Sequence, residues 1–215
     1  MTIYNDALSS FITQTFAPED NSLVHIREQI EARGLPDITV RPEEGRFLQV
    51  LVAACRARLA LEIGTLGGYS GTWIARGLPD GGRLITLEVD PKRAEIASEH
   101  FRLAGVDDRV EIRIGDAHSL LPELSDEGPF DFVFIDAEKE GYPAYLRWTV
   151  EHLRPGGVLA AHNAFRRGAI LDPEDQAPVV VATREFHQMV AQDPRLLATI
   201  FPAGDGMTIA VLQGA

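Results

Sequence analysis

The sequence predicts an α/β protein with a doubly wound, mostly parallel seven-stranded sheet, N-terminal helices and an antiparallel C-terminal hairpin. Short apolar runs alternate with helical segments from Leu59 onward, a pattern typical of βαβ units. Runs such as Phe132–Ile135 are apolar on both faces, as in strands covered by helices on both sides. The last two runs are separated only by Ala203–Gly206, too short for a helical crossover, so we expect a hairpin there.

The elements follow in order along one domain, 1–215, made of N-terminal helices (1–57) and an α/β core (58–215) that binds the ligand. Apolar positions at helical spacing predict helices over 3–16, 22–34 and 43–57, punctuated by proline. A later helix begins at Pro91 with Asp90 as its N-cap. The predicted strands are 59–63, 83–88, 110–114, 130–135, 157–162, 196–202 and 207–212.

Composition excludes several classes of protein. The 215 residues are 45% hydrophobic and 24% charged, as in an ordinary globular domain. Lys and Arg number 20 against 32 Asp and Glu, and the net charge of −12 disfavours nucleic acid as a partner. Cys55 is the only cysteine, which excludes an internal disulfide. The N-terminus does not read as a signal peptide, and no apolar stretch is long enough for a membrane span, so we expect a cytoplasmic protein.

A glycine-rich turn, Gly64–Gly71, follows the first predicted strand and leads into a helix. A dinucleotide fingerprint would need glycine where Leu66 and Tyr69 stand, so close approach of a pyrophosphate is not provided for. An adenosyl ligand without phosphates tolerates these side chains, which points to S-adenosylmethionine. The alternative is a turn needed only to fold a strand onto a helix.

Acidic residues end the next two strands. Glu88 is expected at the carboxyl end of the second strand, where a carboxylate can accept hydrogen bonds from both ribose hydroxyls. Asp116 and Ala117 follow the third strand and are candidates for the adenine edge. Asp116 is equally well interpreted as the N-cap of a helix over 117–125, and both roles are compatible.

The fourth and fifth strands end in a second group of polar residues. Asp136, His162 and Asn163 offer a carboxylate, an imidazole and an amide oxygen, a candidate three-ligand site for a divalent metal. Lys139 is a candidate general base if neighbouring cation charge and burial lower its pKa. The alternative is a capping carboxylate, a satisfied histidine and a solvated lysine.

Taken together, the motifs resemble the cation-dependent O-methyltransferases, the family that includes the caffeoyl-CoA and catechol enzymes and bacterial members. The resemblance runs in order through VRPEEG (40–45), LEIGTLGGYS (61–70), the Glu88 strand, GDA (115–117), FDFVFIDAEKEGY (130–142), LRPGGVLAAHN (153–163) and DGMTIAVL (205–212). It implies a class I methyltransferase sheet, S-adenosylmethionine as cofactor, and usually a homodimer. It also implies methyl transfer to a hydroxyl of a catechol-like or other small hydroxylated acceptor, with metal assistance.

The resemblance also assigns roles to residues. Asp136 matches the first metal ligand, and Lys139 matches the catalytic lysine of the D-x-x-K pattern. The positions that match cofactor contacts are Val40, Glu62, Gly64, Thr65, Ser70, Glu88, Asp116, Ala117 and Asp136.

One departure concerns the metal. The family pattern after the fifth strand is Asp-Asn, whereas His162-Asn163 stands here. Imidazole is a poorer ligand for magnesium than for manganese or another transition metal, so a manganese preference is expected, with protonation near a pKa of about 6.5 competing with metal. The loop 164–177 is expected to help set the acceptor, and its Arg166 and Arg167 either meet an acidic substrate or are simply solvated.

Two other functions stay open from the sequence. One is methylation of a hydroxylated wobble uridine in tRNA, against which the acidic charge counts. The other is a non-catalytic cofactor-binding protein in which His162 marks a lost metal site. The presence of Asp136, Lys139 and Asn163 together argues against such a loss.

Overall fold

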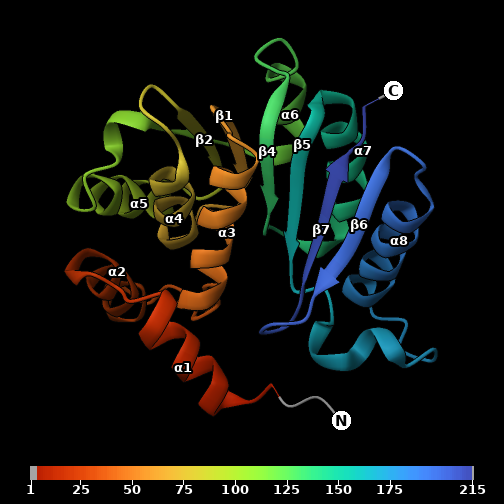
Figure 1. Ribbon diagram of the computed structural model, residues 1–215, viewed down its shortest axis with the longest axis horizontal. Coiled ribbons are helices and arrows are strands. Elements are labelled where there is room, and N and C mark those ends of the chain that lie inside the picture. The colour runs from red at the N-terminus through yellow and green to blue at the C-terminus, as the bar shows by residue number, and fades with distance from the viewer. Residues whose placement is uncertain (1–3, 215) are drawn as a thin grey trace.

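The computed structural model describes residues 4–214, and within them a seven-stranded sheet forms the centre of the molecule (Figure 1). The strand order is β3-β2-β1-β4-β5-β7-β6. The first five strands along the chain pair in parallel, and β7 runs antiparallel between β5 and β6. The strands are β1 (Leu59–Ile63), β2 (Arg83–Glu88), β3 (Val110–Ile114), β4 (Phe130–Ile135), β5 (Leu153–His162), β6 (Leu196–Phe201) and β7 (Met207–Leu212).

Helices precede and connect the strands. The α-helices are α1 (Asp6–Phe16), α2 (Asn21–Ala32), α3 (Pro42–Ala54), α4 (Tyr69–Gly77), α5 (Pro91–Leu103), α6 (Ala117–Glu123), α7 (Tyr142–His152) and α8 (Pro178–Gln192). Three short 3-10 helices are η1 (Asp107–Arg109), η2 (Lys139–Gly141) and η3 (Arg166–Leu171). Asp90 accepts a hydrogen bond from Lys92 N as the N-cap of α5, and Pro91 is its first residue, as predicted.

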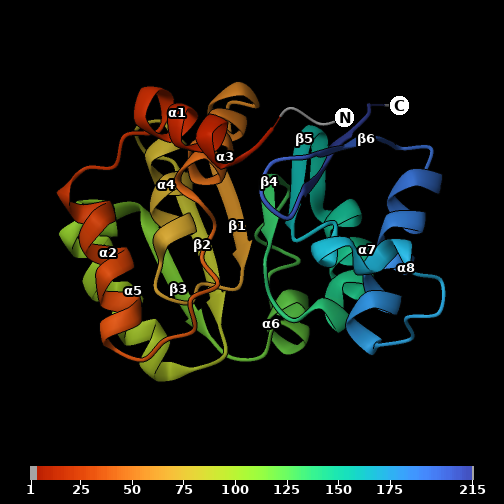
Figure 2. The ribbon, with the colours of Figure 1, turned by 90° about the horizontal axis from the view of Figure 1, so that it is seen from below.

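Two apolar cores lie on opposite faces of the sheet, as seen from below in Figure 2. Phe132 and Phe134 of β4 belong to the core that α2, α3, α4 and α5 cover. Val133 and Ile135, the alternate residues of the same strand, belong to the core under α6, α7 and α8. Burial on both faces explains why the central strands are apolar at consecutive positions.

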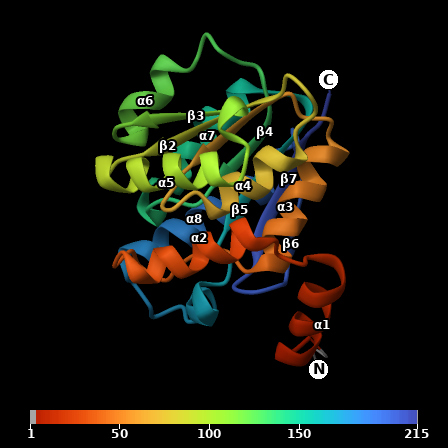
Figure 3. The same ribbon diagram turned by 90° about the vertical axis from the view of Figure 1, so that its left-hand side faces the viewer.

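The predicted fold class is confirmed, and its boundaries differ in small ways. Helix α3 ends at Ala54 rather than at residue 57, and β5 begins at Leu153 rather than at residue 157. The first predicted helix begins at Asp6, and its expected start at residue 3 lies outside the described residues. Helix α1 projects from the body below α3 (Figure 3). None of the helices in residues 4–214 combines the length and hydropathy that a bilayer crossing needs.

The sheet topology decides where a ligand can bind. Strand β1 pairs with β2 on one side and with β4 on the other, so the chain reverses its direction of progress across the sheet at this point. In an open parallel sheet the loops at such a switch point diverge and leave a crevice beyond the carboxyl ends of the strands. The loops after β1, β2, β3, β4 and β5 meet there.

Candidate active site

A cavity of about 1080 Å³ opens at the carboxyl ends of the parallel strands. Gly64, Leu66 and Glu88 line it after β1 and β2. The loop before α3 and the turn between β6 and β7 also contribute to its wall. Further lining residues are Arg41, Glu44, Asp116, Ala117, Asp136, Lys139, His162, Asn163, Arg166, Arg167, Gly204 and Asp205.

The glycine-rich turn after β1 lies close to the backbone at the end of β4. Gly64 has φ +102, and a Cβ built on it would lie 2.3 Å from the carbonyl oxygen of Asp136. Leu66 has φ 49, and its N–H donates to Oε2 of Glu88 at 2.8 Å. Oε1 of Glu88 accepts from Asp90 N at 3.0 Å. The turn and the end of β2 therefore hold the Glu88 carboxylate at the cavity wall with 5% exposure.

Glu62 lies behind this wall and is fully buried. Its carboxylate accepts hydrogen bonds from Ser70 Oγ and Thr86 Oγ1, both at 2.6 Å. Burial raises the pKa of Glu62 to about 7, although the two hydroxyl donors oppose the rise. Thr65 Oγ1 lies 2.6 Å from the same Thr86 hydroxyl and 3.0 Å from the carbonyl oxygen of Leu87. This polar network holds the glycine-rich turn against β2.

The structure therefore divides the nine predicted cofactor residues into two groups. Five line the cavity. Asp116 is one of them, and it also accepts a hydrogen bond from His118 N as the N-cap of α6, as predicted. Four do not line it: Val40 lies in an apolar core, and Glu62, Thr65 and Ser70 form the network behind the wall. The five lining residues are Gly64, Glu88, Asp116, Ala117 and Asp136.

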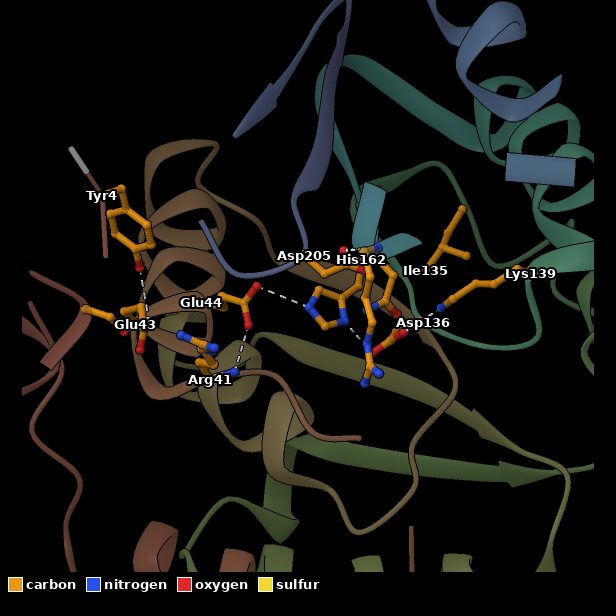
Figure 4. Close-up of polar contacts among 12 residues, drawn as sticks. Tyr4, Arg41, Glu43, Glu44, Ile135, Asp136, Lys139, His162 and Asp205 are labelled. Carbon is orange, nitrogen blue, oxygen red and sulfur yellow. Dashed lines mark hydrogen bonds and ion pairs between the residues drawn. The ribbon is translucent and has the colours of Figure 1, made fainter. Parts of the chain in front are cut away.

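Past the ends of β4 and β5, four charged side chains form a row (Figure 4). Lys139 Nζ donates to Asp136 Oδ1 at 2.8 Å. Asp136 Oδ2 lies 3.2 Å from Nδ1 of His162, an ion pair without hydrogen-bond alignment. On the other side of the ring, Nε2 of His162 lies 3.1 Å from Oε1 of Glu44. Cations and carboxylates thus alternate along the row.

Neighbouring charges shift the pKa values of three members of the row, Lys139, Asp136 and His162. Burial would lower the pKa of His162, but the Asp136 charge and the contacts with Asp136 and Glu44 outweigh it and raise it to about 10. Burial would raise the pKa of Asp136, yet Lys139 and His162 hold it well below its ordinary value. The pKa of Lys139 is raised despite burial, because Tyr142 and Asp136 favour the cation. A neutral lysine base would need a lowered pKa, and the shift at Lys139 runs in the opposite direction.

The predicted metal site does not fit this geometry. A divalent metal needs free oxygen or nitrogen lone pairs at about 2.0–2.6 Å. Both Asp136 oxygens face cations, and both ring nitrogens of His162 face carboxylates. Asn163 Nδ2 donates to Asp205 Oδ2 at 3.4 Å, which does not occupy the amide oxygen, so the misfit lies at Asp136 and His162. Among residues 4–214, no group of three or more His, Cys, Asp or Glu side chains is arranged to hold a metal ion.

Sequence reasoning missed two residues at this site. Glu44 lies in the first turn of α3, and its Oε2 accepts from Arg41 N at 2.8 Å, so the local pattern indicates only a helix cap. Tyr142 OH lies 2.6 Å from Lys139 Nζ and donates to the carbonyl oxygen of Ile135 at 3.0 Å. The sequence signal that could have identified Tyr142 is its position three residues after Lys139, a spacing at which the two side chains can meet.

The loop after β5 presents two arginines in a left-handed backbone conformation. Arg166 and Arg167 have φ 49 and 54, a region that disfavours residues with a Cβ. Asp205 holds the loop, since its Oδ1 accepts from Arg167 N at 2.6 Å and its carbonyl oxygen accepts from Phe165 N at 2.8 Å. Both arginines line the cavity, half-buried at Arg166 and exposed at Arg167.

The fold and site together define a class I methyltransferase: a seven-stranded sheet ending in an antiparallel hairpin, with a glycine-rich turn and an acidic β2 end at the switch point. Comparison with known proteins agrees. A family model described as O-methyltransferase matches residues 13–212. A catechol O-methyltransferase of Niastella koreensis is 40% identical over 97% of both chains, and one of Mycobacterium tuberculosis is 41% identical over 96% of this chain and 95% of its own.

Solved structures show the same relationship. An O-methyltransferase from Bacillus cereus in complex with SAH has a TM-score of 0.92 and 40% identity, covering 96% of this chain and 97% of its own. An O-methyltransferase of tomaymycin synthesis from Streptomyces achromogenes, in complex with SAM, has a TM-score of 0.91 and 36% identity, covering 97% and 96%. The chain belongs to the O-methyltransferase family. The predicted family and the predicted enzyme class, an S-adenosylmethionine-dependent O-methyltransferase, are confirmed.

Proposed function

We propose that this chain transfers a methyl group from S-adenosylmethionine to a hydroxyl of a catechol-like, vicinally dihydroxylated small molecule. The observation that carries the proposal is that a single cavity has two differently lined parts. Glu88 and Ala117 line it near β2 and β3, and Asp136, Lys139 and His162 line it near β4 and β5. The catechol O-methyltransferases at 40% and 41% identity support the acceptor class.

In this proposal the cofactor lies along the β1, β2 and β3 ends. Glu88 accepts the two ribose hydroxyls, while Gly64, Asp116 and Ala117 contact the adenosyl and methionyl parts. Glu62, Thr65 and Ser70 act from behind the wall by holding the glycine-rich turn, and Val40 acts through packing. Asp136 is shared between the two halves of the cavity. All of these assignments rest on motif matches together with the geometry described above.

Lys139 is the proposed catalytic residue, acting as a cation and not as a neutral base. A catechol hydroxyl ionises near a pKa of about 10, and a positive charge beside its oxygen lowers that value. The hydroxyl proton passes to solvent, and the oxyanion held near Lys139 attacks the methyl carbon. The oxygen–carbon bond forms as the carbon–sulfur bond breaks, and the electron pair returns to sulfur. Positioning and electrostatic stabilisation supply most of the rate.

The proposal also covers assembly, location and metal. A homodimer and a cytoplasmic location are proposed from the sequence and the family resemblance. A divalent metal, magnesium or manganese, is implied by that resemblance, but no step is assigned to it because the donor atoms of Asp136 and His162 are engaged with other side chains. Neither tRNA methylation nor cofactor binding without catalysis is favoured, since the chain is acidic and its named relatives are small-molecule enzymes.

The proposal is tested with methyl-deuterated S-adenosylmethionine and a panel of acceptors: catechol, a carboxylated catechol, a monophenol and a hydroxyuridine-containing tRNA. Mass spectrometry should find the label on the two catechols and not on the monophenol or the tRNA. Lys139→Ala should abolish most of the signal, whereas Lys92→Ala, at an exposed position on α5, should leave it intact. Label on the tRNA alone would reassign the acceptor class.

A further inference from the structure

The side chains of the protein itself fill the place where the family resemblance implies a metal. The row Glu44–His162–Asp136–Lys139 is largely shielded from water, with side-chain exposures of 2%, 6%, 19% and 10%. It holds two carboxylates and two basic groups, and every close polar contact within it joins opposite charges. A divalent ion entering here would have to displace His162 from Asp136 or Lys139 from Asp136.

The structure encloses the Glu44 end of the row tightly. Oε2 of Glu44 is engaged by Arg41 N at 2.8 Å, which leaves Oε1 for His162. The turn between β6 and β7 covers this carboxylate at Gly204, where φ is +58 and a Cβ would lie 2.3 Å from Oε1. The Glu44 carboxylate therefore has little room to turn away, and the His162 ring is held between two fixed anions.

We propose that this chain transfers methyl groups without a divalent metal, and that His162 and Lys139 together take the place of that cation. The inference rests on the function proposed above. The two basic side chains flank Asp136 and face the cavity that receives the acceptor, so they supply positive charge where the hydroxyl becomes an oxyanion. The balance of the reaction is unchanged: one proton goes to water, and neutral S-adenosylhomocysteine and the methyl ether are formed.

His162 is the residue that decides between the two kinds of site. The family pattern has Asp at this position, and a carboxylate there would stand beside Asp136 and Glu44, leaving Lys139 as the one basic group within the row against three carboxylates. Oxygen-rich, anionic clusters are what magnesium and manganese bind. With His162, each carboxylate of the row already faces a basic side chain within 3.2 Å. The replacement of the family's Asp by His162 therefore converts a potential cation site into an ion-pair network.

The test is a titration of Mn²⁺ into chelator-treated full-length protein, followed by electron paramagnetic resonance of the free ion. The native chain should leave Mn²⁺ free at concentrations where His162→Asp binds one ion per chain, at least tenfold more tightly. His25→Asp, the same substitution at an exposed position on α2, should behave like the native chain. In parallel, methyl transfer by the native enzyme should be unchanged by excess chelator.

Two results would overturn the inference. One is a single Mn²⁺ per native chain bound at micromolar concentration, and the other is loss of native activity in chelator that Mn²⁺ or Mg²⁺ restores. If His162→Asp does not fold, the native titration and the chelator assay still decide. Absence of methyl transfer under every condition would contradict the proposed function, while the Mn²⁺ titration would still report on the site.

Discussion

The buried carboxyl group of Glu62 makes the stability of the chain depend on pH. Its ordinary pKa of 4.5 is raised to about 7, so the folded chain binds this proton more tightly than the unfolded chain does. Its contribution to stability is complete below about pH 4.5 and is lost as the pH rises through about 7. Since one pKa unit is about 1.4 kcal/mol, the loss is about 3 kcal/mol near pH 8 and below about 1 kcal/mol near pH 5.

Glu62→Gln removes this ionisation and keeps an oxygen that can accept from Ser70 or Thr86. The free energy of unfolding of each protein is measured by urea titration at about pH 5 and about pH 8. The difference, variant minus native, should be about 2–3 kcal/mol more positive at the higher pH. Packing differences that do not depend on pH cancel in this comparison. Glu123→Gln, exposed on α6, should show no such change. A difference between Glu62→Gln and native protein that is constant with pH would refute the reasoning.

Three further predictions concern the site. Lys139→Ala should lower turnover by roughly 10²-fold or more and leave S-adenosylmethionine affinity unchanged, because the cation acts on the acceptor oxygen; unchanged turnover in steady-state kinetics would remove it from the mechanism. Glu88→Ala should weaken cofactor binding by about 1–3 kcal/mol in calorimetry through loss of charged hydrogen bonds, and equal affinity would mean that the ribose lies elsewhere. Gly64→Ala should destabilise the fold by at least about 2 kcal/mol in denaturant titrations, since the new Cβ would overlap the Asp136 carbonyl oxygen; a native-like midpoint would contradict the close approach.

The sheet was predictable because its signals are local. Strands β1, β2, β3 and β4 match the predicted bounds. For β1, β2 and β4 the reason is that buried parallel strands are short apolar runs bounded by polar residues. The start of β5 was not predicted: Pro155 and Gly156 indicate a break, yet Leu153 pairs with Phe130 across a register shift. Residues that follow neighbouring parallel strands lie close together at the carboxyl edge of the sheet. The predicted proximity of Asp136 and His162 is correct because β4 and β5 are neighbours.

The electrostatics of the site were not predictable in this way. The contact between His162 and Glu44 joins residues 118 positions apart, from the end of β5 and the start of α3, and no local pattern indicates it. If the contact with Glu44 is not known, the sequence indicates a histidine beside one carboxylate, which is typical of a metal ligand with an ordinary pKa of about 6.5. With it, the ring lies between two carboxylates and its pKa is raised to about 10. The expected competition between proton and metal in mild acid loses its basis.

Transfer of a methyl group to an acceptor oxygen is the central claim, and carbon-13 nuclear magnetic resonance tests it most directly. The native enzyme is incubated with S-adenosylmethionine labelled at the methyl carbon and with catechol. The account predicts that the sulfonium methyl signal falls while an aryl methyl ether signal rises in equal amount, together with S-adenosylhomocysteine. A label that stays on sulfur while the cofactor is bound, or that appears on a ring carbon, would contradict it.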